Sequence, residues 1–249
     1  MANVFDYLDW RGDLTLDLVP LCDVDALVLS RLSYLPLDGL VPPEGATVGA
    51  LMRQLLASKP PLLLPEDGRF IPALAASQRF CEMRIMDYVN QIDLESQTQF
   101  AAITVYLDDD HACAVFRGTD ATLVGWKEDF RLAFRKPLAS QEMSSVYLNQ
   151  VGCKLPGAFM VCGHSKGGNL AAYAATWAET GVQRRITDIY SLDGPGFLPE
   201  VFEGDSYEQI RSRVHRILPY SSLVGMLLQN YEQYEVVKSS GIGILQHDA

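Results

Sequence analysis

The sequence lacks the features that mark several large classes of protein. Its five cysteines are scattered and form no C-x-x-C pair, which argues against a structural metal, a redox motif and a disulfide framework. Basic residues are also few: 20 Lys and Arg stand against 31 Asp and Glu, and no local basic stripe offsets the net charge of −11. Because this charge repels phosphate groups, we expect no nucleic-acid partner.

Long apolar runs are missing too. A membrane-spanning helix requires about 18 apolar residues, and no stretch of the sequence reaches this length, so stable insertion into a bilayer is not expected. The first residues, MANVFDYLDWRGDL, carry acids where a secretory signal would carry basic residues and a long apolar segment. These features predict a reduced, cytoplasmic, soluble protein, and they leave its oligomeric state undetermined.

The composition is that of one globular domain. The chain has 249 residues, of which 48% are hydrophobic and 20% charged, enough to bury a large core without disulfides or metals. We expect residues 1–95 to form a mainly helical N-terminal extension, with one helix capped by Asp23 and a second following Thr47. Residues 96–249 then form the core, which carries the candidate catalytic residues.

From residue 100 onward, predicted strands alternate with predicted helices. A hairpin is expected from strands at 100–107 and 113–116, with Asp108 to Asp110 at a solvated tip, because their spacing is not that of a calcium loop. This alternation favours a mostly parallel sheet covered by helices on both faces. Further strands are predicted at 158–162, 186–192, 214–218 and 235–238, and helices at 140–151, 167–180, 207–213 and 223–229.

The segment Gly163-His164-Ser165-Lys166-Gly167-Gly168 lies between a predicted strand and a predicted helix. That is the context of a G-x-S-x-G nucleophile elbow, in which a serine occupies a strained turn and the glycines let the strand and helix backbones approach. The alternative is a glycine-rich turn whose serine only caps the helix. A serine hydroxyl is a weak nucleophile, so Ser165 would also need a base, a group that orients this base, and donors for an oxyanion.

The elbow supplies one oxyanion donor itself, the backbone N–H of Lys166 at a helix N-terminus. A second donor is expected from an earlier strand end, and the turn Arg117-Gly118-Thr119 after the hairpin is the candidate, with Thr119 providing the amide. An ordinary capped turn is the alternative interpretation of this segment.

Several segments together resemble known lipases. FRGT at 116–119, followed by Trp126 and then by GHSKGGNLA at 163–171, is similar to class three (fungal-type) lipases. In combination with SLDGPGF, SSLVGMLL, VVKS and QHD, these motifs more closely resemble a lipase-like bacterial family of unknown function in the α/β-hydrolase superfamily. The resemblance runs from Asp23 to the C-terminus. It implies an α/β-hydrolase fold, an oxyanion role for the FRGT turn and a candidate lid around Trp126.

The base must be one of four histidines. His111 lies on the hairpin tip and precedes Ser165, and His164 points away from the serine if the elbow has its usual shape. His215 alternates with apolar residues of a strand, whereas His247 follows the last predicted strand, where α/β-hydrolases usually place their base. We therefore favour His247, with His215 as the alternative.

The acid is where the sequence departs from the class three lipase pattern. The matching segment, 221–225, has two serines and no carboxylate. Asp193, at the end of a predicted strand, is the favoured substitute, and it preserves the order Ser, Asp, His. A turn role for Asp193, use of the Ser222 position, and the weaker candidates Asp205 and Asp248 are alternatives.

These residues together predict a serine hydrolase that cleaves carboxylic esters, including lipid esters, through an acyl-enzyme intermediate. Neither a cofactor nor a metal is expected, and the partner is a small-molecule or lipid ester. Two alternatives remain: a catalytically inactive hydrolase fold that acts as a binding module, and a thioesterase or peptidase that uses the same triad.

Overall fold

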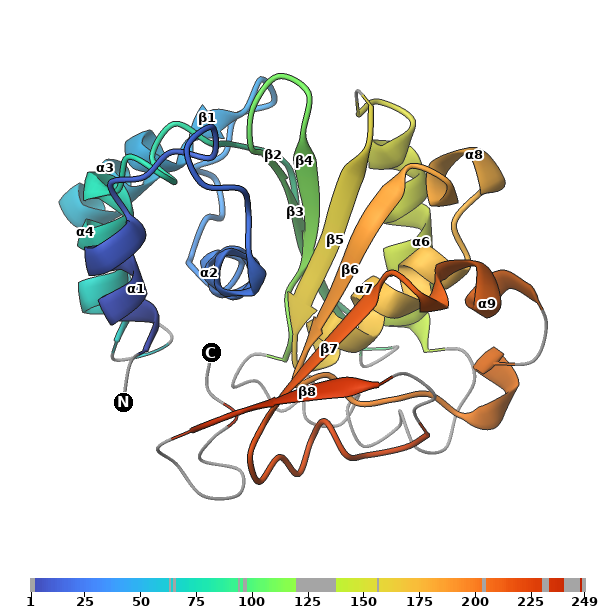
Figure 1. Ribbon diagram of the computed structural model, residues 1–249. Helices are drawn as coiled ribbons and strands as arrows, with labels where there is room; N and C mark the ends of the chain where they lie inside the picture. Colours follow the sequence, from blue (N-terminus) through green and yellow to red (C-terminus); the bar gives the residue numbers. More distant parts are fainter. Residues whose placement is uncertain are drawn as a thin grey trace.

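A computed structural model describes most of the chain. The described residues are 3–62, 64, 66–93, 95, 98–119, 138–155, 157–202, 205–229, 233–239 and 247. In Figure 1, helices lie on both sides of a central sheet that runs through the middle of the molecule.

The sheet has eight strands, which lie side by side in the order of the sequence. The pairings from the first to the fourth strand are antiparallel, and those from the fourth to the eighth are parallel. The strands are β1 (Ala46–Thr47), β2 (Arg84–Asp93), β3 (Thr98–Tyr106), β4 (Ala112–Phe116), β5 (Phe159–His164), β6 (Ile186–Leu192), β7 (Val214–Pro219) and β8 (Tyr234–Val237).

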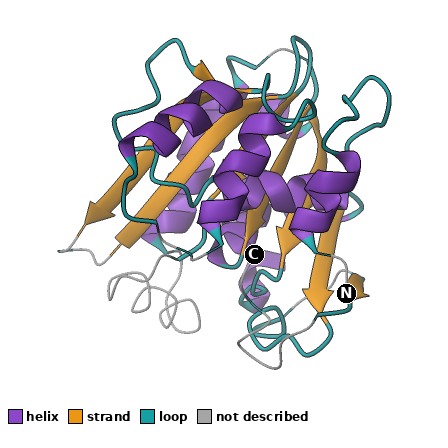
Figure 2. Ribbon diagram, turned by 90° about the vertical axis from the view of Figure 1, so that its left-hand side faces the viewer, coloured by secondary structure: helices purple, strands orange, loops and turns teal. Residues whose placement is uncertain are grey.

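The helices form a layer on each face of the sheet. One layer consists of α1 (Val4–Arg11), α2 (Asp23–Leu32), α3 (Val48–Ser58) and α4 (Asp67–Ala76), of which α2 packs on β4, β5 and β6. Figure 2 shows this layer in front of the sheet. The opposite layer comprises α6 (Ala139–Gly152), α7 (Lys166–Thr176), α8 (Thr180–Gln183), α9 (Asp205–Arg211) and the 3₁₀ helix Pro199–Phe202.

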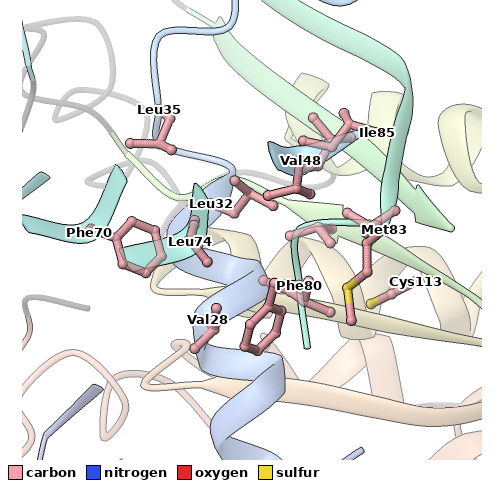
Figure 3. Packing of buried hydrophobic residues seen from close by; sticks show 14 of the residues in the cluster. Val28, Leu32, Leu35, Val48, Phe70, Leu74, Phe80, Met83, Ile85 and Cys113 are labelled. Atoms are coloured by element: carbon pink, nitrogen blue, oxygen red, sulfur yellow. The ribbon is translucent and has the colours of Figure 1, made fainter. Parts of the chain in front are cut away.

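Each face of the sheet has its own buried apolar cluster. The cluster under the N-terminal helices joins residues such as Val28, Leu32, Phe70 and Phe80 to side chains of the sheet, including Cys113 (Figure 3). The second cluster lies under α6 and α7 and includes the alanines of α7. Both layers are therefore anchored to the sheet by burial of apolar surface, which is the main favourable term in folding.

The predicted mostly parallel sheet with flanking helices is confirmed. The helices expected at Asp23 and after Thr47 are α2 and α3, with the Thr47 hydroxyl accepting a hydrogen bond from the Ala50 N–H. The expected cap at Asp23 is wrong: Asp23 is the first residue of α2 and Cys22 precedes it at the N-cap, with its N–H donating to the Asp25 carboxylate. The part described as mainly helical also contains β1 and β2. The sequence pattern does not predict strand β2, because the register of this strand shifts between Met86 and Val89 and many of its residues are polar.

The predicted helix at 223–229 is wrong. Residues 223–229 form turns, and Leu228 has a φ of 65°, which a helix does not allow. The reason is tertiary: the backbone groups of this segment bind the segment that carries Asp193. Gly225 N–H donates to the Asp193 carboxylate, the Leu227 carbonyl accepts from Gly196 N–H, and Gln229 and Phe197 exchange two backbone hydrogen bonds.

Two features are missing from the described part of the chain. None of its helices combines the length and the apolarity that a transmembrane segment needs. No group of three or more His, Cys, Asp or Glu side chains among those same residues is arranged to hold a metal ion.

Candidate active site

Ser165 lies at a sharp junction between a strand and a helix. It follows β5 directly and precedes α7, and its backbone has φ 59° and ψ −132°, a strained conformation for a residue with a side chain. Such a conformation lifts the side chain out of the strand and turns it toward the end of the sheet. The carboxyl ends of the parallel strands, where Ser165 lies, form the lower edge of the sheet in Figure 1.

The glycines of the motif allow this junction to form. A Cβ atom on Gly163 would overlap the backbone of Gly167, and one on Gly167 would overlap the carbonyl of Phe116. Gly168 packs against the β6 side chain Ser191, whose Oγ would lie 2.9 Å from an added Cβ. Strand β5, helix α7 and strand β4 therefore approach one another more closely than any side chain at 163 or 167 would permit.

The structure brings Ser165, His247 and Asp193 into one chain of hydrogen bonds. Nε2 of His247 lies 2.6 Å from Oγ of Ser165, and Nδ1 of His247 lies 2.6 Å from Oδ2 of Asp193. Ser165 and Asp193 are buried, and the His247 side chain is 19% exposed. The tautomer that satisfies both contacts carries its proton on Nδ1, so that Nε2 can accept the serine proton.

The Asp193 carboxylate is held by several donors. Asp193 directly follows β6, and its φ of 47° turns the side chain toward the loop after β7. Its Oδ1 accepts hydrogen bonds from the Ser222 hydroxyl and from the Gly225 N–H. Burial alone would raise the pKa of this carboxyl, but the hydrogen bonds from His247 and Ser222 and the nearby imidazole outweigh it and lower the pKa. Asp193 is therefore ionised at neutral pH.

Arg216 fixes the backbone on both sides of the acid. This arginine of β7 is buried, and its guanidinium donates hydrogen bonds to the carbonyls of Gly194 and Gly225. Burial lowers its pKa to about 10, although the Asp193 carboxylate opposes this change. The guanidinium thus stays charged at neutral pH and balances the charge of Asp193 in a buried site.

The two expected oxyanion donors are the backbone amides of Lys166 and Thr119. Lys166 is the first residue of α7, so its N–H belongs to the helix N-terminus next to the nucleophile. Thr119 follows Gly118, whose added Cβ would lie 3.1 Å from the Cβ of Ser165. The Lys166 side chain turns away and donates a hydrogen bond from Nζ to the carbonyl of Gln99 at 3.0 Å.

The other candidate residues have different surroundings. His215 pairs with Asp188 at 2.8 Å on neighbouring strands, and His111 pairs with Asp108 at the exposed hairpin tip. Asp205 begins α9. Trp126, the candidate lid residue, and Asp248 lie outside the described residues.

The sequence does not predict a supporting role for three residues near the site. Tyr34 and His164 contact each other, with Oη of Tyr34 3.2 Å from Nδ1 of His164, and Arg216 supports the acid. The only signal for Arg216 is a charged residue inside a short apolar strand, which must find buried partners. Nothing in the sequence near Tyr34 indicates the contact, because its partner lies 130 residues away.

Comparison with known proteins places the chain in a family. No curated protein matches it. Two solved lipase structures are each similar to it at 15% identity: the M37 lipase, with 78% of this chain and 66% of that chain covered and a TM-score of 0.45, and the Rhizomucor miehei lipase in its propeptide complex, with 80% and 60% covered and a TM-score of 0.46. This chain therefore spans 66% and 60% of the two lipases, less than two thirds of either. Residues 74–249, more than half of the sequence, match the Mbeg1-like family, so the predicted resemblance to a lipase-like family is confirmed and the chain belongs to the Mbeg1-like family.

Proposed function

We propose that this protein is a serine hydrolase that cleaves carboxylic esters through a covalent acyl-enzyme. The observation that carries the proposal is the continuous hydrogen-bond chain from Ser165 Oγ to His247 and on to Asp193, with both distances at 2.6 Å. Three residues far apart in the sequence meet here, and the order of their side chains is that of a nucleophile, a base and an acid.

The first half of the reaction forms the acyl-enzyme. Ser165 Oγ attacks the ester carbonyl carbon while its proton passes to Nε2 of His247. The amides of Thr119 and Lys166 stabilise the negative charge that develops on the carbonyl oxygen. The imidazolium then gives its proton to the leaving alcohol as the C–O bond breaks, and Asp193 stabilises the positive charge of the ring until then.

The second half releases the acid. Nε2 of His247 takes a proton from water, whose oxygen attacks the acyl carbon of the ester on Ser165. The tetrahedral species collapses, the bond to Oγ breaks, and the proton on His247 returns to the serine. The carboxylic acid product leaves, and the site returns to its starting state.

The charge on Asp193 favours catalysis over a binding role alone. The alternative is an inactive hydrolase fold, because segment 221–225, which matches the acid position of class three lipases, has serines and no carboxylate. Here Ser222 donates to an ionised carboxylate that in turn orients the base, so an anion is present where the imidazolium forms.

The test is covalent labelling of the serine together with a substrate panel. The wild-type protein is treated with a fluorophosphonate and assayed on p-nitrophenyl esters of increasing acyl length, an acyl thioester and a peptide anilide. We expect stoichiometric labelling at Ser165 and ester turnover. Ser165→Ala should lose labelling and lower turnover by about 10⁴-fold to 10⁶-fold.

A matched control variant is Ser145→Ala, which removes an exposed hydroxyl that binds only the carbonyl of Trp177 among the described residues. It should react like the wild type. Folded wild-type protein that neither reacts with the fluorophosphonate nor hydrolyses any substrate would refute the proposal. Preferential turnover of the thioester would indicate a thioesterase, and preferential turnover of the anilide would indicate a peptidase.

A further inference from the structure

The imidazole of His247 needs a third restraint. Its two hydrogen bonds, to Ser165 and to Asp193, both lie at ring nitrogens and close to the ring plane. Two such contacts leave the ring able to tilt about the line that joins them. A base must keep its lone pair aligned with the serine proton for efficient transfer, so a contact on the ring face or on the backbone contributes to positioning.

His164 supplies that restraint. Its ring lies against the ring of His247, with centroids 4.8 Å apart and planes 35° apart. His164 ends β5 and is itself buried, so it belongs to the rigid part of the elbow. The burial, followed by the adjacent His247, lowers the pKa of His164 to about 3. A neutral His164 does not repel the imidazolium that forms on His247.

Tyr34 connects His164 to the oxyanion turn. Its Oη accepts a hydrogen bond from the Gly118 N–H at 3.1 Å and lies 3.2 Å from Nδ1 of His164. Two acceptors of His164 lie within reach of the Tyr34 O–H: Nδ1, and the backbone carbonyl at 3.5 Å. The same hydroxyl therefore joins the residue before Thr119 to His164.

No residue with a side chain can replace Gly118 without a shift of its neighbours. A Cβ there would overlap Oη of Tyr34 and would lie 2.7 Å from the carbonyl oxygen of His164. The absence of a side chain is what lets Tyr34, which follows helix α2 of the N-terminal layer, reach the elbow. The N-terminal layer therefore contributes a side chain to the surroundings of the reaction and does not only cover the sheet.

We propose that Tyr34 and His164 form a positioning pair that holds the base His247 and the Gly118–Thr119 turn in register with Ser165. This inference rests on the proposed hydrolase function. Neither residue contacts substrate in it: His164 restrains the base, and Tyr34 restrains both His164 and the turn that carries the oxyanion donor.

The test compares two buried tyrosines. Tyr34→Phe removes only the hydroxyl that joins Gly118 to His164. Tyr207→Phe is the matched control, because Tyr207 is also buried and its hydroxyl has no hydrogen-bond partner among the described residues. For both variants, kcat and KM on a p-nitrophenyl ester and the rate of fluorophosphonate labelling are measured per titrated active site, and thermal midpoints are recorded.

We expect Tyr34→Phe to lower kcat and the labelling rate by about tenfold to a hundredfold, somewhat less than the loss of an oxyanion donor itself, with KM within about twofold. Tyr207→Phe should leave both rates unchanged. His164→Phe, which keeps a flat ring but no hydrogen bond, should lower kcat to a similar extent. In ¹H NMR spectra, the downfield proton between His247 and Asp193 should be sharp in the wild type and broadened by exchange in Tyr34→Phe.

The outcomes separate the two proposals. If the wild type is labelled and active while Tyr34→Phe keeps full kcat and a sharp downfield proton, the positioning pair is refuted and the hydrolase function stands. If Tyr34→Phe and Tyr207→Phe lose activity equally, the effect is one of general packing and the pair is also refuted. If the wild type shows neither labelling nor turnover, the hydrolase function fails and the positioning pair fails with it.

Discussion

The nucleophile and its two partners are held in place by different means. Around Ser165, the backbones of β4, β5 and α7 touch where glycines permit it, and almost every neighbouring residue is buried. Around Asp193, the supports are hydrogen bonds from Ser222 and Gly225 to the carboxylate and from Arg216 to the carbonyls of Gly194 and Gly225. The loop that carries two of these donors exposes its large apolar side chains, Leu223, Met226 and Leu227, at 56–59%.

This difference explains what each region requires from the sequence. The elbow is defined by its own residues, since the glycine spacing, the strained serine and the following helix all lie within a few positions. The acid–base region is defined by partners 29 to 54 residues apart, so its conformation exists only once the sheet has formed. Substitutions of the elbow glycines should therefore act mainly on folding, and those around the acid mainly on catalysis.

Among substitutions around the acid, the largest catalytic effect is expected from Asp193→Asn. The amide keeps the shape but removes the negative charge, and it can orient His247 in the wrong tautomer, so kcat should fall by about 10⁴-fold. The matched control is Asp188→Asn, since Asp188 also pairs with a histidine at 2.8 Å but lies away from Ser165. Ester turnover and urea unfolding should be measured on both. Near-full activity in Asp193→Asn would mean that a different group orients the base.

In the elbow, Gly167→Ala should act on stability. A Cβ at this position would overlap the carbonyl oxygen of Phe116 and lie 2.9 Å from the carbonyl carbon of Arg117, and these backbone atoms belong to packed elements. We expect the free energy of unfolding to fall by about 2–3 kcal/mol or the protein to fail to fold. Gly68→Ala is the control, because a Cβ there meets nothing within 4 Å and a helical alanine should stabilise by about 0.5–1 kcal/mol. Equal stabilities for the two variants would contradict the close approach.

The difference between the elbow and the acid–base region also explains how much of the fold and the site could be predicted from the sequence. Ser165 and the strand and helix around it could be predicted because glycine and apolar patterns determine them locally. The apolar residues Leu223, Met226 and Leu227 have helical spacing, yet they are exposed on a loop whose backbone groups bind the segment after Asp193. Local periodicity contains no information about those distant partners, and the Tyr34–His164 contact was hidden for the same reason.

The pH dependence of stability should distinguish the elbow from the acid. Burial lowers the pKa of His164 to about 3, so the folded state binds fewer protons than the unfolded chain below the usual histidine pKa of about 6.5. Stability from this group is complete above about pH 6.5 and is lost as the pH falls toward 3. The lowered pKa of Asp193 acts in the same direction, but only below its usual value of 3.8.

Urea unfolding between pH 6.5 and 4.5 therefore reports on His164. We expect the free energy of unfolding to fall by roughly 2 kcal/mol over this range in the wild type. The decrease should be smaller in His164→Phe. In His215→Asn, which alters a histidine of β7 that pairs with Asp188, it should equal that of the wild type. A slope that survives in His164→Phe would assign the proton uptake to other groups.

The smallest effect is expected from Ser222→Ala. Ser222 occupies the segment where class three lipases carry their acid, and its hydroxyl donates to Oδ1 of Asp193. The carboxylate loses one of its donors in this variant but keeps the Gly225 N–H at 3.2 Å, and its contact with His247 involves the other oxygen. A hydrogen bond to a charged group contributes about 1.5–3 kcal/mol at most, and part of that is recovered by the remaining donor and by water, so kcat should fall about threefold to tenfold. A loss as large as that of Asp193→Asn would mean that the serine, and not the carboxylate, determines the orientation of the base.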